Sequence, residues 1–195
     1  MLSFRVSHLD MFREWEENDE ADLQQFLSRL NTHSPTEDML RGTAFHSALE
    51  TLIGGEVDEL DANGFSFRFD GDYEIPDAKI KEIRCHKNYC GIDVSGQVDG
   101  IYGKHIIDHK AATWFDAERY FKKYAWRYYL DIFDADRFTW YVWEMQEDEQ
   151  QPRSYVVRDL HILEQFRYPD LERDCKALAM RMKLFAEQYL VTETV

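Results

Sequence analysis

Cysteine, proline and glycine are scarce in this sequence. Its 195 residues include 3 cysteines, 4 prolines and 9 glycines. The cysteines, Cys85, Cys90 and Cys175, are odd in number and never spaced as C-x-x-C. This pattern excludes a zinc or disulfide framework and a four-cysteine iron–sulfur cluster, and it favours the reduced thiols of a cytoplasmic protein. Because no linker rich in serine, glycine or proline and no internal repeat is present, we expect a single domain over residues 1–195.

Long apolar runs are absent as well. The apolar stretches are only a few residues long, whereas a membrane-spanning helix needs about 20 residues. The N-terminal segment lacks the basic and apolar regions of a signal peptide. We therefore expect no contact with a membrane. A glycine-rich phosphate loop and a nucleophile-elbow motif are also missing, which argues against an ATP-driven motor and a serine hydrolase.

Basic residues are few relative to acidic ones. The chain has 23 Lys and Arg against 38 Asp and Glu, a formal charge of −15. Such a balance is unusual for a DNA-binding protein, because phosphate contacts need Lys and Arg. The basic residues are grouped, however, and a local cleft can differ in sign from the whole protein. The two groups are Arg119, Lys122, Lys123 and Arg127, and Lys79, Lys81, Arg84 and Lys87. The acidic runs are either solvated faces or a dedicated binding surface.

Periodicity and turn signals divide the chain into helices and strands. Ser34-Pro35-Thr36-Glu37 has the form of a capping box, and it begins a helix that runs to about Ile53 before Gly54-Gly55. The other expected helices are His8–Glu17, Glu20–Leu30, Asp116–Phe133 and Pro169–Leu190. The expected strands are Phe65–Phe69, Lys79–Asn88, a hairpin over Gly91–Ala111, Phe138–Met145 and Tyr155–Leu163. This order predicts an α/β domain with a central mixed β-sheet flanked by helices.

The hairpin contains the most informative pattern. A turn centred on Gly103-Lys104, with glycine at the first central position, places Asp99 opposite Asp108. Cross-strand partners have Cβ atoms about 5 Å apart, and like charges there are destabilising. Lys110 projects from the same face as Asp108, because strand side chains alternate. Two carboxylates beside an ammonium favour a site for a hard divalent cation.

An ordinary surface ion-pair cluster is the alternative for these three residues. The neighbouring Ile101, Ile106 and Ile107 are apolar, which indicates a central hairpin rather than a peripheral one.

Four segments in order resemble a known family. They are RGTAFHSALE at Arg41–Glu50, GQVD at Gly96–Asp99, DHK at Asp108–Lys110, and YAWRYYLDIF at Tyr124–Phe133. Together they resemble the PD-(D/E)XK nuclease superfamily, and within it RecB-type and phage exonuclease domains. The resemblance covers about Arg41 to Trp143. It implies a restriction-endonuclease-like αβββαβ core at about residues 36–146, with helical additions at both ends.

The resemblance implies roles for the site residues. Asp99, Asp108, the main-chain carbonyl of His109 and the imidazole of His46 would bind Mg²⁺ or Mn²⁺, and Lys110 would lie beside the attacking water. The imidazole of His109 would point to the opposite face of its strand. The alternative is that His46 is an ordinary histidine of the core or the surface, with its hydrogen bonds satisfied and no metal bound. Glu50 is either a hydrogen-bond partner that supports His46 or a solvated side chain.

The helix expected after Asp116 carries the implied DNA contacts. Tyr129 matches a tyrosine of the resembling family, but Ala125 stands where a glutamine is usual. Lys122, Lys123 and Arg127 would compensate by contacting phosphates, or else form a solvated basic face.

The resemblance therefore predicts a metal-dependent deoxyribonuclease, a phage or mobile-element exonuclease that acts in DNA recombination or processing in a bacterial host cell. Two alternatives stay open. One is a catalytically weakened nuclease fold that binds DNA or a recombination partner protein, and the other is an unrelated metal-dependent hydrolase. The 5 tryptophans and 11 tyrosines permit a homo-oligomer but do not require one.

Overall fold

A single mixed sheet organises the protein. The computed structural model describes residues 2–31, 34–50, 58–76, 78 and 80–190. The strands are β1 (Ser3–Arg5), β2 (Glu59–Ala62), β3 (Phe65–Phe69), β4 (Ile80–Tyr89), β5 (Ile92–Tyr102), β6 (His105–Ala112), β7 (Arg137–Glu147) and β8 (Ser154–Phe166). The helices are α1 (Val6–Glu16), α2 (Leu23–Asn31), α3 (Glu37–Glu50), α4 (Ala117–Lys122), α5 (Ala125–Ile132) and α6 (Leu171–Tyr189). None of these helices is long and apolar enough to cross a membrane.

The sheet mixes parallel and antiparallel neighbours. Its order is β1-β5-β6-β7-β8-β3-β2, and β4 pairs separately with β5. Strands β1 and β5, β6 and β7, and β3 and β8 run parallel, whereas the hairpin pairs run antiparallel. The expected mixed α/β sheet flanked by helices is therefore confirmed. The series α3, β4–β6, α4–α5 and β7 contains the expected αβββαβ order, with the β2–β3 hairpin inserted after α3.

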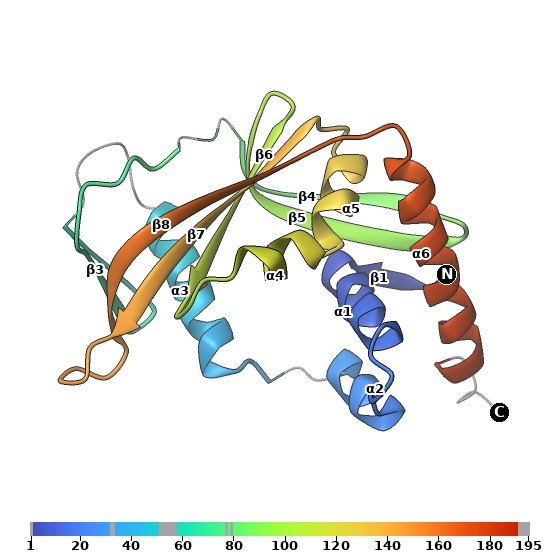
Figure 1. Ribbon diagram of the computed structural model, residues 1–195, viewed down its shortest axis with the longest axis horizontal. Coiled ribbons are helices and arrows are strands. Elements are labelled where there is room, and N and C mark those ends of the chain that lie inside the picture. The colour runs from blue at the N-terminus through green and yellow to red at the C-terminus, as the bar shows by residue number, and fades with distance from the viewer. Residues whose placement is uncertain (1, 32–33, 51–57, 77, 79, 191–195) are drawn as a thin grey trace.

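Three apolar clusters attach the helices to this sheet. One joins α1, α2 and α6 to the end of β4 and the start of β5, with Phe12 and Tyr128 inside it. A second joins α3 to β3, β7 and β8 around Phe45 and Trp143. A third lies between α4–α5 and β6–β7 and includes Trp140. Figure 1 shows α1, α5 and α6 gathered at one end of the molecule, α3 at the other, and α4 between them.

Strand β5 changes partner along one edge. Strand β1 pairs with Asp93–Ser95 and β6 pairs with Gly100–Tyr102, while β4 follows the other edge. Among the described residues, the ladder between β5 and β6 therefore does not include residues 96–99 of β5 or 108–110 of β6. We call this opening the fork. It leaves side chains and main-chain groups in the middle of the sheet free for a site.

The expected helix over Asp116–Phe133 is wrong, because the chain forms two helices there. Lys123 is extended, with φ −60° and ψ 143°, and separates α4 from α5. Side chains of α1 satisfy the broken ends: the Tyr124 N–H donates to Asp10, and Arg13 donates to the carbonyl of Lys122. The break therefore depends on residues more than a hundred positions away in the chain.

The N-terminal end of α3 also differs from expectation. Its cap is Thr36 and not Ser34, because Thr36 Oγ1 accepts the N–H of Met39 at 3.3 Å. Glu37 pairs with Arg153 at 2.8 Å and does not close a capping box. The predicted helix end at Ile53 and the glycines after it lie outside the described residues.

Two short strands were not expected. Strand β1 places a strand in the N-terminal addition, where only helices were predicted. Strand β2 forms a hairpin with β3 through Asn63 and Gly64, whose φ values are 51° and 78°. An Asn-Gly pair with two positive φ values is typical of a type I′ hairpin turn, so this signal was present in the sequence.

Candidate active site

The fork brings together four side chains that the sequence analysis singled out. Nδ1 of His46, on α3, lies 3.2 Å from Oδ1 of Asp99 on β5. Nζ of Lys110 lies 2.7 Å from Oδ2 of Asp108, and both residues are on β6. The predicted hairpin register is confirmed by the pairs from Tyr102–His105 to Gly100–Ile107, and the ladder ends one position before Asp99 and Asp108. Gly103 has the positive φ, 61°, that the turn required.

Asp99 holds the fork open. Its Oδ2 accepts the main-chain N–H of His109 at 2.6 Å, so a side chain replaces the ladder hydrogen bond that β5 would otherwise make. Burial raises the pKa of Asp99, but the hydrogen bond with His46 and the charge of Lys110 outweigh it and lower the pKa to about 2. The carboxylate is therefore ionised at neutral pH.

Asp108 is the most constrained group of the site. The residue is only 4% exposed. Its Oδ2 is paired with the Lys110 ammonium at 2.7 Å, and no other described residue donates a hydrogen bond to this oxygen. Burial raises the pKa of Asp108, because a desolvated carboxylate is costly unless a cation balances it.

Lys110 supplies part of that balance. Its ammonium also donates to the main-chain carbonyl of His109 at 3.2 Å. Burial lowers the pKa of Lys110, but the charges of Asp108 and Asp99 raise it by more, so the ammonium stays protonated. The side chain is 40% exposed, which leaves it accessible to a ligand from solvent.

The imidazole of His109 has a separate, structural role. Its Nδ1 accepts the indole N–H of Trp143 at 3.1 Å, and its ring lies 5.5 Å from the ring of Tyr141. Burial lowers the pKa of His109 to about 4, which keeps the imidazole neutral at pH 7. Only the carbonyl of this residue is presented to Lys110.

Glu50 is exposed, and its hydrogen-bond partner is Glu82 of β4 instead of His46. Partial desolvation and this second carboxyl group raise the pKa of Glu50. Glu82 has a positive φ, 48°, and its position in β4 falls opposite Asp99. Sequence reasoning missed Glu82, because an irregular residue within a strand has no periodic signal.

Tyr129 is the one predicted DNA contact that lies at the fork. Burial, and then the charge of Asp108, raises the pKa of its phenol. Ala125, one turn earlier, packs partly buried against the cluster of α1 and α6, where the resembling family would have a glutamine. Tyr120 of α4 also lies near the charges of Lys110 and Asp108, and no sequence motif marked it.

The predicted basic residues differ in how free their side chains are to bind a phosphate. Arg127 is held by other contacts, since its guanidinium lies 4.3 Å from the Trp126 ring and donates to the hydroxyl of Tyr168 at 3.1 Å. These contacts make it a packing residue of α5. Lys122 is exposed and pairs with Glu118 at 3.2 Å, whereas Lys123 is half-buried at the end of α4. The lysines are therefore better placed to reach a phosphate than Arg127.

Comparisons with known proteins address the fold. The protein named SSO0001 is 15% identical with a TM-score of 0.54, over 95% of this chain and 76% of that chain. A structure named "Putative exonuclease" from Eubacterium rectale is 10% identical with a TM-score of 0.52, over 92% and 78%. This chain shares their fold. LHK-Exo in complex with dAMP is 15% identical with a TM-score of 0.46, over 94% and 89%. No family profile and no curated protein matches the chain.

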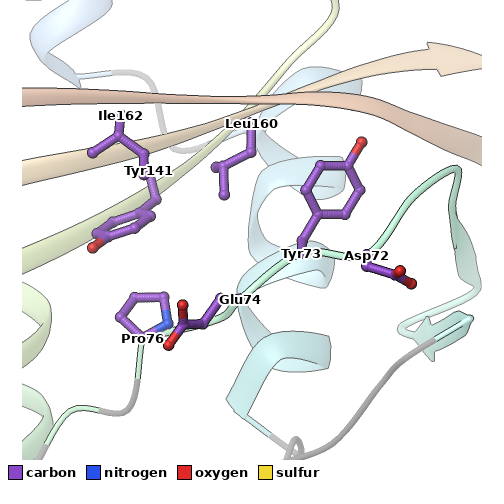
Figure 2. A pocket seen from close by; sticks show the side chains of 7 residues that line it. All are labelled: Asp72, Tyr73, Glu74, Pro76, Tyr141, Leu160 and Ile162. Atoms are coloured by element: carbon purple, nitrogen blue, oxygen red, sulfur yellow. The ribbon is translucent and has the colours of Figure 1, made fainter.

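A hollow of about 440 Å³ lies outside the fork. Figure 2 shows Glu74 and Asp72 on one side of it and Tyr141 on β7 on the other. Its described lining includes these two carboxylates and no Lys or Arg. A phosphate chain would be repelled by such a lining, so we assign it no role in binding nucleic acid.

Gly96 lets the Tyr129 ring approach the fork, and Gly96→Ala is expected to destabilise the protein. A Cβ at Gly96 would lie 3.1 Å from two atoms of the ring and 3.3 Å from Val6. The ring is itself stacked on Phe138, with centroids 5.7 Å apart, so it has little room to move. We expect a loss of about 1–3 kcal/mol in the free energy of unfolding, measured by urea denaturation.

The matched control for this prediction is Gly42→Ala in α3. Nothing lies within 4 Å of a Cβ at Gly42, and alanine is favoured over glycine within a helix by about 0.5–1 kcal/mol. This variant should be at least as stable as the wild type. Equal stability of Gly96→Ala and the wild type would contradict the packing argument.

Proposed function

We propose that the fork is the active site of a deoxyribonuclease that depends on Mg²⁺ or Mn²⁺. The observation that carries the proposal is the buried carboxylate of Asp108, whose Oδ2 is paired with the Lys110 ammonium and accepts no hydrogen bond from any other described residue. Buried ionisable groups with perturbed pKa values are concentrated at functional sites. The fold shared with a structure named as an exonuclease supports the same function.

The donor atoms at the fork suit such an ion. Asp99, Asp108 and the carbonyl of His109 offer the oxygen ligands that hard divalent cations prefer, and His46 adds an imidazole that favours Mn²⁺. Within the described part of the chain, no three His, Cys, Asp or Glu side chains form a ready metal-holding group. The Lys110 ammonium contacts two of the donors, so cation binding requires this side chain to move aside.

The residues of the chain divide the work. When bound, the metal ion polarises the phosphodiester and favours deprotonation of water. Lys110 places a positive charge beside the phosphate and the attacking water. Asp99 fixes the main chain at His109 through its N–H, and the buried Tyr129 phenol remains a hydrogen-bond donor at the edge of the site.

The proposal has four further parts: exonuclease action, a role in recombination or DNA processing, a phage or mobile-element origin, and a location in the bacterial cytoplasm. They rest on the resemblance of the four sequence segments. The three cysteines are free thiols, which suits a reducing compartment. A recombination partner protein and a homo-oligomer are further elements of the proposal.

Ala125 and the charge of −15 favour a second candidate, a catalytically weakened fold that binds DNA or a protein. The deciding experiment incubates the protein with end-labelled linear duplex and with closed circular DNA, in Mg²⁺, in Mn²⁺ and in EDTA. Cleavage of the linear DNA alone, only with metal, is expected for an exonuclease. Cutting of the circle would indicate an endonuclease, and no cutting of either, with retained binding, would favour the second candidate.

A further inference from the structure

An exposed tryptophan and a row of basic side chains lie directly after the strand that carries Lys110. Trp114, in the loop after β6, is 55% exposed. The guanidinium of Arg119 lies 5.7 Å from the centre of its ring, within the range of a cation–π contact. Lys122 follows Arg119 at i+3, so both start from the same side of α4, and Lys123 comes directly after the helix. We call Trp114, Arg119, Lys122 and Lys123 the platform.

The loop that carries the platform is held in place by packing. The ring of Phe115 stacks on His161 with centroids 3.7 Å apart, at an angle of 5°, and His161 pairs with Glu144 of β7 at 2.7 Å. Asp116 caps α4 by accepting the N–H of Glu118 at 3.0 Å. A large exposed ring on an anchored loop loses little conformational freedom on binding a ligand.

The platform is continuous with the fork. Trp114 follows Lys110 by only four residues, which span about 14 Å at most. Tyr120, the buried residue of α4, lies close enough to Lys110 and Asp108 for their charges to act on its phenol. In Figure 1, α4 leaves the end of β6 and runs along the sheet between α3 and α1. A chain bound to the platform would therefore lead toward the fork.

The chemistry of the platform selects one kind of ligand. Flat rings that stack on bases, together with cations that follow the backbone, are the means by which proteins bind single-stranded nucleic acid. Inside a duplex, each base is covered on both faces by its neighbours and cannot stack on Trp114. An acidic peptide would need only the cations and would leave the ring without a partner.

We propose that Trp114 and Arg119, with Lys122 and Lys123, bind an unpaired DNA strand and guide it to the fork. A base stacks on the face of Trp114, and the basic side chains neutralise the neighbouring phosphates. This inference rests on the proposed function, and it adds that the nuclease engages single-stranded DNA or frayed ends.

The test measures DNA binding separately from cleavage. Fluorescence anisotropy with a labelled 20-nucleotide oligothymidylate and a labelled 20-base-pair duplex, in EDTA, compares the wild type with Trp114→Ala and Trp114→Phe. The alanine variant should bind the single strand about five- to hundredfold more weakly and the duplex within about twofold of wild type. Trp114→Phe should retain most of the binding, because it keeps a ring.

Phe166→Ala is the matched control. Phe166 is 59% exposed and pairs with Arg137, next to the start of β6 and at the far end from its junction with Trp114. Its removal should leave both affinities unchanged. The platform would be wrong if Trp114→Ala bound the oligonucleotide with wild-type affinity, or if it lost equal affinity for single strand and duplex. In that case, metal-dependent cleavage by the wild type would still support the proposed function. A wild type that neither binds nor cuts DNA would overturn both.

Discussion

Lys110→Ala is expected to reduce DNA cleavage by about a hundredfold to ten-thousandfold, the usual contribution of a positioned acid–base group. The ammonium is the positive group of the fork that touches both Asp108 and the carbonyl of His109. Its loss removes this positive charge from beside the phosphate at the fork. The rate is measured on end-labelled linear duplex at saturating Mn²⁺, and thermal melts establish that the variant is folded.

Lys104→Ala is the control for this prediction. Lys104 is in the turn of the same hairpin, 59% exposed, and pairs with Asp134 at 3.2 Å. The substitution removes the same charge from the same hairpin without touching the fork, so cleavage should continue at the wild-type rate. If Lys110→Ala cleaved DNA as fast as Lys104→Ala, the catalytic role of Lys110 would be wrong.

Asp131→Ala is expected to have the largest effect on stability. The Asp131 side chain on α5 is 0% exposed and bonds Lys87 at 2.8 Å, Arg167 at 3.1 Å and the Tyr89 hydroxyl at 2.7 Å. It thus ties α5 to β4 and to the segment after β8. Removing one member of a buried ionic network leaves the others unpaired and costs about 3–5 kcal/mol. Urea denaturation followed by circular dichroism measures the loss.

Asp136→Ala provides the comparison for an exposed carboxylate. Asp136 is 63% exposed and lies 4.0 Å from Lys104, and such surface pairs contribute less than about 1 kcal/mol. A loss below about 1 kcal/mol for Asp131→Ala as well would mean that the network does not stabilise the placement of α5. The same helix carries Tyr129, so the network also holds the element that brings this tyrosine to the fork.

The hairpin was predictable because its signals are local. A turn glycine and the alternation of side chains determine which residues of two adjacent strands face each other, and the pairing Tyr102–His105 confirms that register. The sequence therefore predicted the register as far as the pair Gly100–Ile107, next to Asp99 and Asp108. It also placed His46 on the helix before the sheet, where the structure brings it to 3.2 Å from Asp99.

Other features depend on contacts between distant residues. The break between α4 and α5 is stabilised by Asp10 and Arg13 of α1, and strand β1 exists only as a parallel partner of Asp93–Ser95. The fork itself arises where β1 ends and β6 begins along one edge of β5. No periodic pattern in 116–133 or in 3–5 contains this information.

The central claim is that the fork binds a divalent cation, and calorimetric titration of Mn²⁺ into the DNA-free protein tests it most directly. Asp108→Asn removes the proposed ligand, and Asp93→Asn is the control, because Asp93 is another β5 carboxylate that pairs with a histidine, His86, at 2.9 Å. The wild type and Asp93→Asn should bind Mn²⁺ alike, and Asp108→Asn at least tenfold more weakly. A wild type that binds no Mn²⁺, or an Asp108→Asn variant that binds it equally well, would contradict the account.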